Sequence, residues 1–312
     1  MERMIDLVRK TNPYLMFVIK KAYQDIYINK IYKLLKKREM NKTEKILINS
    51  SSEPVFLESQ MLEFLHNEYP IPHPFIYDQK NLEQRERVRV FNIFRLMHSQ
   101  KIKIKDFLEI GCGKGICCYI LKRFGANISG IDVDDNFDEK AKKIGVNLIK
   151  MDASNLKFKE ENFDFVYSYD SFEHFLDPEK VLKEAIRVTK KSGYIYISLG
   201  LPYNAPWGPH AYRSINFPYW QHLFNEDLVK SFIIEKNLHP LPEYTFNKWK
   251  VADFRNLWKK YSEQLKIIKY KETLDLRYLS LIRRYPSCFK SKINNFEDLI
   301  VTTVEILFKK LL

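Results

Sequence analysis

The sequence predicts an α/β protein with a doubly wound, mostly parallel sheet. Between residues 107 and 199, short apolar runs recur, and stretches with helical spacing separate them. This alternation is typical of βαβ units, in which the strands form a parallel sheet and the helices cover its faces. With 45% hydrophobic and 29% charged residues, the 312-residue chain has the composition of a globular protein with a substantial core.

Each expected element follows from its hydrophobic pattern. The strands are expected at 107–110, 128–133, 146–149, 163–169 and 194–199. The helices between them are expected at 116–124, 137–144 and 178–189, with one at 82–98 before the first strand. After Leu201 this regularity ends, because residues 202–224 are rich in aromatic residues and proline, which indicates a loop or lid. A helix is expected at 226–236, and β-branched residues at 299–308 predict a last strand.

The first 80 residues predict a basic, helical N-terminal cap. Apolar residues fall at helical spacing over 16–35 with lysines between them, and Pro70, Pro72 and Pro74 then favour an extended segment. The catalytic domain is therefore expected at 81–312. Its parts are a core at 100–200, the lid or insertion at 202–224, C-terminal additions at 237–298 and the last strand.

The net charge of +13 is concentrated at the two ends of the chain. Residues 1–40 hold ten Lys/Arg against four Asp/Glu, and residues 246–312 hold fifteen against seven. The ends therefore carry +6 and +8, which leaves −1 for the middle. Basic termini favour an anionic partner such as nucleic acid or phospholipid headgroups. A general richness in lysine explains the same numbers, so both interpretations stay open.

The chain shows no pattern of membrane insertion, secretion or metal ligation. No apolar run approaches the roughly 18 residues of a spanning helix, and acidic Glu2 and Asp6 stand where a signal peptide is basic. A cytoplasmic location is expected, with attachment of the N-terminal helix to the inner membrane surface left open. The four cysteines lack disulfide or zinc spacing, so no metal site is expected: Cys112, Cys117, Cys118 and Cys288.

The segment Phe107-Leu-Glu-Ile-Gly-Cys-Gly-Lys-Gly115 carries the chemistry. An apolar strand that runs into a glycine-rich turn and a helix forms a ligand site at the carboxyl edge of a sheet. The sixth position of the turn is Ile116, whereas the dinucleotide fingerprint requires glycine there. Glu109 also places a carboxylate ahead of the turn, which favours a positively charged ligand over a pyrophosphate.

At these residues the sequence resembles the class I S-adenosylmethionine-dependent methyltransferases, in particular their type 11-like domain. The first motif of that family is an acidic residue followed by Gly-x-Gly-x-Gly, here Glu109 with Gly111, Gly113 and Gly115. The resemblance implies a Rossmann-like, seven-stranded, mostly parallel sheet and S-adenosyl-L-methionine as the cofactor.

The resemblance also assigns roles along the following strands. Asp132 matches the acid that accepts hydrogen bonds from the ribose hydroxyls, with Asp134 as the alternative. Asp152 matches the acid that receives the adenine amino group, and Ala153 supplies the next backbone N–H. Tyr169 matches the cofactor edge of the fourth strand, where its ring could face the sulfonium.

The acceptor is predicted only as a class. The fourth motif lacks the Asn/Asp-Pro-Pro-Tyr/Phe and Pro-Cys sequences of base methyltransferases, which favours O- or N-methylation of a small molecule or a sugar or glycan-linked group. His174 and His210 are the candidates for a general base, and structural hydrogen bonds are an equal explanation for each. The alternatives are an RNA methyltransferase that uses the basic termini and a non-catalytic scaffold or membrane-surface protein. The oligomeric state is not predicted.

Overall fold

The computed structural model describes residues 33–69, 78–102, 104–243 and 246–311. The chain divides into two compact units, a larger one of residues 55–275 and 292–312 and a smaller one of residues 1–54 and 276–291. Most of the helix predicted over 16–35 lies outside the described residues, and so does the proline-rich segment at 70–77. The predicted boundary between an N-terminal cap at 1–80 and a catalytic domain at 81–312 remains a prediction.

The smaller unit joins two segments that lie far apart in the sequence. Residues 33–49 are helical, and the second segment contains α11 (Leu279–Arg284) and α12 (Pro286–Lys290). The Arg283 guanidinium donates to Glu39 Oε2 at 3.1 Å and to Thr43 Oγ1 at 2.9 Å. Lys290 Nζ donates to the Ile48 carbonyl at 2.8 Å. These charge-assisted contacts hold the second segment on the helix at 33–49.

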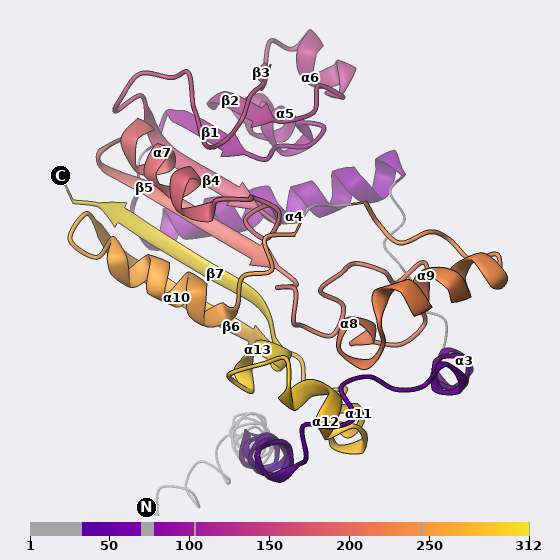
Figure 1. Ribbon diagram of the computed structural model, residues 1–312. Helices are drawn as coiled ribbons and strands as arrows, with labels where there is room; N and C mark the ends of the chain where they lie inside the picture. Colours follow the sequence, from indigo (N-terminus) through magenta and orange to yellow (C-terminus); the bar gives the residue numbers. More distant parts are fainter. Residues whose placement is uncertain (1–32, 70–77, 103, 244–245, 312) are drawn as a thin grey trace, which may run out of the picture. The chain divides into compact units, whose positions relative to one another are not determined.

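A seven-stranded sheet forms the centre of the larger unit (Figure 1), in the order β3-β2-β1-β4-β5-β7-β6. β1 to β5 pair in parallel, and β7 runs antiparallel between β5 and β6. The strands are β1 (Asp106–Ile110), β2 (Asn127–Asp132), β3 (Asn147–Lys150), β4 (Phe163–Tyr169), β5 (Thr189–Gly200), β6 (Leu265–Leu274) and β7 (Val301–Lys310). The predicted mostly parallel, seven-stranded α/β fold is confirmed.

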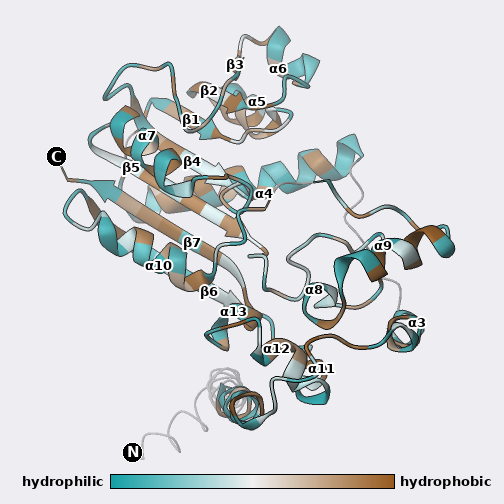
Figure 2. Ribbon diagram, viewed as in Figure 1, coloured by the Kyte–Doolittle hydropathy of each residue, from teal (hydrophilic) through white to brown (hydrophobic). Residues whose placement is uncertain are grey.

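Helices cover both faces of the sheet because its strands are apolar on both sides. On β1, Phe107 packs in the cluster that α4 (Gln79–Ser99), α5 (Ile116–Arg123) and α6 (Glu139–Lys143) complete. Its neighbour Leu108 packs in the opposite cluster, with α7 (Pro178–Val188) and α10 (Val251–Lys260). Figure 2 shows both hydrophobic and hydrophilic residues on α7 and α10, as expected for helices with one buried side.

The C-terminal part departs from the sequence-based prediction in one element. β6 lies inside the predicted additions at 237–298, where no strand was expected. Six of its ten residues are exposed, and three are lysines, at positions 266, 269 and 271, as is common on the edge strand of a sheet. The predicted last strand is present as β7, whereas Leu299 and Ile300 belong to the short helix α13 (Glu297–Ile300).

The remaining elements lie around the 202–224 segment. They are α3 (Ser59–Glu68), α8 (Trp220–Leu223) and α9 (Glu226–Glu235), the last of which matches the predicted helix at 226–236. Residues 202–219 form turns without a regular element. Among the described residues, no helix combines the length and the apolar character needed to cross a bilayer.

Candidate functional site

The sheet order brings four of the predicted motifs to one edge. β3, β2, β1 and β4 are neighbours and run in parallel, so their carboxyl ends lie side by side. The glycine turn follows β1, Asp132 ends β2, Asp152 follows β3 and Tyr169 ends β4. In a doubly wound fold, ligands bind outside this edge.

The turn after β1 requires glycine for reasons of space and conformation. Gly111, Gly113 and Gly115 all have left-handed φ angles, of 75°, 51° and 73°. A Cβ on Gly111 would lie 2.3 Å from Ser171 Oγ, and one on Gly115 would lie 2.7 Å from Leu148 Cδ2. Gly113 differs, because no described atom lies within 4 Å of the position of its Cβ. The turn therefore packs tightly at both ends and is open in its middle.

Two carboxylates follow the turn along the sheet edge, at the ends of the next two strands, β2 and β3. Asp132 Oδ2 accepts from the Gly113 amide at 2.7 Å, and its Oδ1 accepts from the Asp134 amide at 3.2 Å. Asp152 is exposed and accepts from the Ser154 amide and hydroxyl at 2.8 and 2.9 Å. The Met151 amide donates to the Asp132 carbonyl at 2.8 Å, which places the two acids on adjacent strand ends. Each carboxylate retains lone pairs for hydroxyl or amino groups of a ligand.

Glu109 lies in the interior of the larger unit. Its side chain is buried, and the carboxyl group accepts hydrogen bonds from Cys118 Sγ at 2.9 Å and from the Tyr167 hydroxyl at 3.2 Å. Burial, with the nearby Glu86 carboxylate second, raises the pKa of Glu109 to about 8. Near neutral pH this carboxyl is therefore mostly protonated. A direct role for Glu109 in binding the cofactor stays a prediction.

Tyr169 and Ala153 are also buried in the core. The Tyr169 hydroxyl donates to the Arg89 carbonyl at 3.2 Å, and the Arg89 guanidinium lies 5.0 Å from the ring centroid. Arg89 in turn pairs with Glu86 at 2.9 Å and with Asp170. Sequence analysis missed this arginine, which comes from α4 and shows no motif.

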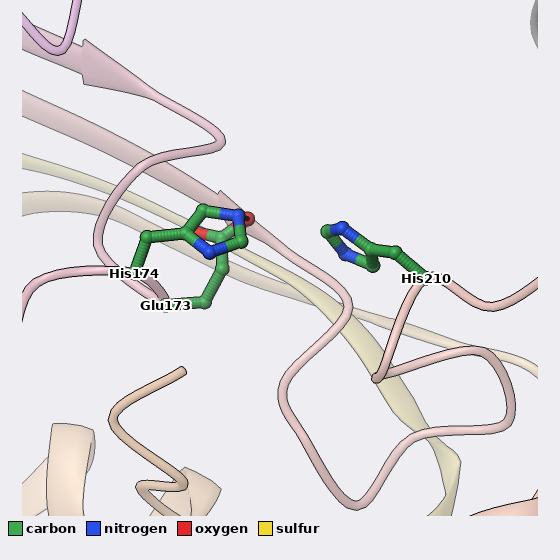
Figure 3. A group of neighbouring side chains, drawn as sticks. All are labelled: Glu173, His174 and His210. Atoms are coloured by element: carbon green, nitrogen blue, oxygen red, sulfur yellow. Dashed lines mark ion pairs between the residues drawn. The ribbon is translucent and has the colours of Figure 1, made fainter. Parts of the chain in front are cut away.

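His174 and His210, 36 positions apart in the sequence, lie together beside Glu173 (Figure 3). Their ring centroids are 5.4 Å apart, and the Phe246 ring lies 4.9 Å from His174 and 5.2 Å from His210. Glu173 Oε1 is 4.0 Å from His174 Nε2. Burial, and then the neighbouring His174, lower the pKa of His210 to about 4, while burial and the Asp170 carboxylate raise the pKa of Glu173 well above its usual range.

Asn247 holds the backbone that carries Glu173 and His174. Its side-chain amide donates to the Phe172 and Phe175 carbonyls at 2.7 and 3.0 Å, and its backbone amide donates to the Glu173 carbonyl at 3.1 Å. Sequence analysis did not find Phe246 or Asn247, because neither belongs to a recognisable pattern. The segment that follows β4 is thus fixed by a loop 72 to 75 residues further along the chain.

Comparisons with known proteins find similarity to methyltransferases. Residues 108–197 match the family model described as a methyltransferase domain. A ubiquinone biosynthesis O-methyltransferase of Hydrogenovibrio crunogenus is 29% identical over 107 residues, which are 32% of this chain and 44% of that protein. The norajmaline N-methyltransferase of Rauvolfia serpentina is 32% identical over 121 residues, 36% of this chain and 40% of that protein.

The matched region spans less than half the length of these curated relatives. Among solved structures, the PH0226 protein of Pyrococcus horikoshii aligns with a TM-score of 0.46 at 20% identity, over 75% of this chain and 92% of that one. The family match begins within β1 and ends within β5, and it includes the glycine turn, Asp132 and Asp152. Residues 108–197 of the chain therefore form a methyltransferase domain.

Proposed function

We propose that this chain transfers a methyl group from S-adenosyl-L-methionine to an oxygen or nitrogen of a small-molecule, sugar or glycan-linked acceptor. The observation that carries the proposal is the open position at Gly113, whose amide donates to the strand-end carboxylate of Asp132 inside the matched methyltransferase region. The curated relatives include both O- and N-methyltransferases, so the class of acceptor atom stays open.

The residues at the sheet edge fit a nucleoside with a positively charged side chain. In this proposal the ribose hydroxyls donate to Asp132, the adenine amino group donates to Asp152, and the nucleoside lies against the backbone at Gly113. When bound, the cofactor would supply a methyl group on a positively charged sulfur, and the acceptor atom would bond to the methyl carbon as the carbon–sulfur bond breaks and a neutral thioether leaves. Alignment and exclusion of water are then the main tasks of the protein.

On the acceptor side we propose His174 and His210 as the residues that contact the acceptor. His174 follows β4 at the same edge of the sheet, and His210 lies in the predicted lid at 202–224. Phe246 beside both rings supplies an apolar wall that limits access of water. Removal of the acceptor's proton by one of these histidines stays a prediction.

Calorimetric titration with S-adenosylmethionine tests the cofactor site. Asp132→Ala removes charge-assisted hydrogen bonds worth about 1.5–3 kcal/mol, so we expect affinity to fall roughly 10- to 150-fold. Asp227→Ala, which removes one exposed acid from α9, is the control that should bind normally. Unchanged binding by Asp132→Ala would exclude the assigned ribose contact.

A matched pair of glycine variants tests the open position. Gly113 and Gly125 both have left-handed φ angles and no described atom within 4 Å of a Cβ, but Gly125 lies just before β2, at the opposite edge of the sheet. We expect Gly113→Trp to abolish cofactor binding and Gly125→Trp to retain it, with similar thermal stability. Equal affinity in both variants would contradict the proposal.

The acceptor can be found with methyl-labelled cofactor and fractionated cell extract. Mass spectrometry of the labelled product then gives the acceptor and the methylated atom. Cofactor binding without transfer to any fraction would favour a non-catalytic role over an enzyme.

A further inference from the structure

We propose that Glu173, His174 and His210 form a binding site for one divalent transition-metal ion of the Zn²⁺ or Fe²⁺ type. Each residue offers one ligand atom, and these atoms all lie within 4.8 Å of one another. Figure 3 shows the two imidazoles facing each other across a gap with the Glu173 carboxyl group beside His174. The three ligands come from two segments, the turn after β4 and the 202–224 loop.

The Glu173 carboxyl group is the observation that points to a ligand. Glu173 is only 2% exposed, and neither carboxylate oxygen has a hydrogen-bond partner among the described residues. Gly200 lies against this carboxyl group, with Oε1 3.9 Å from the position of a Gly200 Cβ. A buried carboxyl group without a partner is costly, and coordination to a metal ion is one of the few ways to satisfy it.

The chemistry of the three ligands selects the class of ion. Imidazole suits Zn, Fe, Cu and Ni, whereas Mg²⁺ and Ca²⁺ prefer sites built from oxygen alone. Two histidines and one carboxylate are a ligand set that leaves coordination positions open for water or a substrate. A site of this composition therefore suits binding of an exchangeable ligand as well as of the ion.

The spacing requires a small closure of the ligands. Bonds of about 2.0–2.1 Å to a tetrahedral ion place ligand atoms about 3.3 Å apart. Glu173 Oε1 and His174 Nε2 are 4.0 Å apart, and no pair exceeds 4.8 Å. The ligands therefore need to approach by at most about 1.5 Å, which rotamer changes of the two half-buried histidines can supply.

The surroundings already restrict two of the ligands. Asn247 fixes the backbone on both sides of Glu173 and His174, and Phe246 packs against both imidazole rings. A fixed backbone beneath the ligands and an apolar wall are what a metal site needs from its surroundings. In the proposed function such an ion would bind an oxygen atom of the acceptor. This role of the ion rests on the proposed function, whereas binding of the ion itself does not.

Metal binding by the full-length, tag-free chain tests this site directly. After treatment with a chelator, the chain is dialysed against micromolar Zn²⁺ and its metal content is measured by mass spectrometry, and Co²⁺ serves as a spectroscopic probe. We expect about one ion per chain and at least tenfold weaker binding in Glu173→Gln, His174→Ala and His210→Ala. His98→Ala and His239→Ala, which remove exposed histidines elsewhere, should bind as the parent chain does.

Several outcomes would overturn the proposal. They are no stoichiometric Zn²⁺, equal binding by the three variants, or a Co²⁺ spectrum with thiolate charge-transfer bands, which would indicate cysteine ligands. Glu173→Gln keeps the shape of the side chain, so it is the variant expected to fold normally. Circular dichroism identifies any variant that fails to fold. If a variant does fail, the Co²⁺ spectrum of the parent chain decides which residues bind the ion. S-adenosylmethionine titrations of the same variants separate the two proposals, because loss of the ion should leave cofactor binding unchanged.

Discussion

Glu109 should make the stability of the larger unit depend on pH between about 5 and 9. Its carboxyl group is buried against Cys118 and Tyr167, and its pKa is raised from 4.5 to about 8. A folded-state pKa above the unfolded value means that the folded chain holds the proton more tightly. The stabilisation is therefore complete below pH 4.5 and is lost as the pH rises through 8.

The size of this pH effect on stability follows from the shift in the pKa of Glu109. Each unit of pKa difference corresponds to about 1.4 kcal/mol, and integration of the linkage relation over this shift gives a loss of roughly 4 kcal/mol between pH 5 and pH 9. Glu109→Gln replaces the protonated carboxyl by a neutral group of similar shape and removes this dependence. Other titrating groups are the same in both chains, so they cancel in the difference.

Urea unfolding of both chains at pH 5, 7 and 9 measures the effect. All four tryptophans lie in the larger unit, so their fluorescence reports on the unit that contains Glu109. We expect the unfolding free energy of the parent chain, relative to that of Glu109→Gln, to fall by roughly 4 kcal/mol from pH 5 to pH 9. Parallel pH profiles of the two chains would refute the buried, mostly protonated carboxyl group.

Three further substitutions test how the site is held. Asn247→Ala removes two side-chain hydrogen bonds from the turn after β4, so it should lower the unfolding free energy by about 2 kcal/mol. Cofactor affinity in calorimetry should stay the same. Weaker cofactor binding would show that this loop also affects the cofactor site. Tyr219→Phe should cost about 1–2 kcal/mol in urea unfolding, since it leaves the buried Leu299 carbonyl without its donor at 2.7 Å; no loss would mean that this carbonyl finds another partner. Gly208→Ala should open the 202–224 segment to limited proteolysis, because its Cβ would lie 2.2 Å from the Tyr203 carbonyl oxygen; an unchanged digestion pattern would contradict that packing.

The parallel part of the fold could be predicted because its signals are local. Each strand from β1 to β5 is a short apolar run, and each helix between them shows its own spacing. β6 carries neither signal. Only Leu265 of its ten residues is buried, and three lysines interrupt its apolar residues, so its strand conformation depends on pairing with β7. A segment whose structure is set by one distant partner has no pattern of its own to detect.

The acids of the site likewise divide into those that the sequence could place and one that depends on packing. Asp132 and Asp152 could be placed at one edge because the ends of adjacent parallel strands must meet there. The face of the sheet to which the Glu109 side chain points could not be predicted, although strand alternation limits it to one of two faces. Leu108 and Ile110 pack with α7 and α10, so Glu109 faces the other side with Phe107, toward α4 and α5. Knowing which side holds Cys118 and Arg89 requires the packed structure.

The histidines show why single residues in the sequence could not define the acceptor side. Taken alone, His174 and His210 each suit a base or a structural hydrogen bond equally well. Their meeting beside Glu173 depends on the path of the irregular 202–219 segment, for which no periodic pattern exists. Because Glu173 is buried without a hydrogen-bond partner, the three residues form one chemical unit, and the role of any one of them depends on the other two.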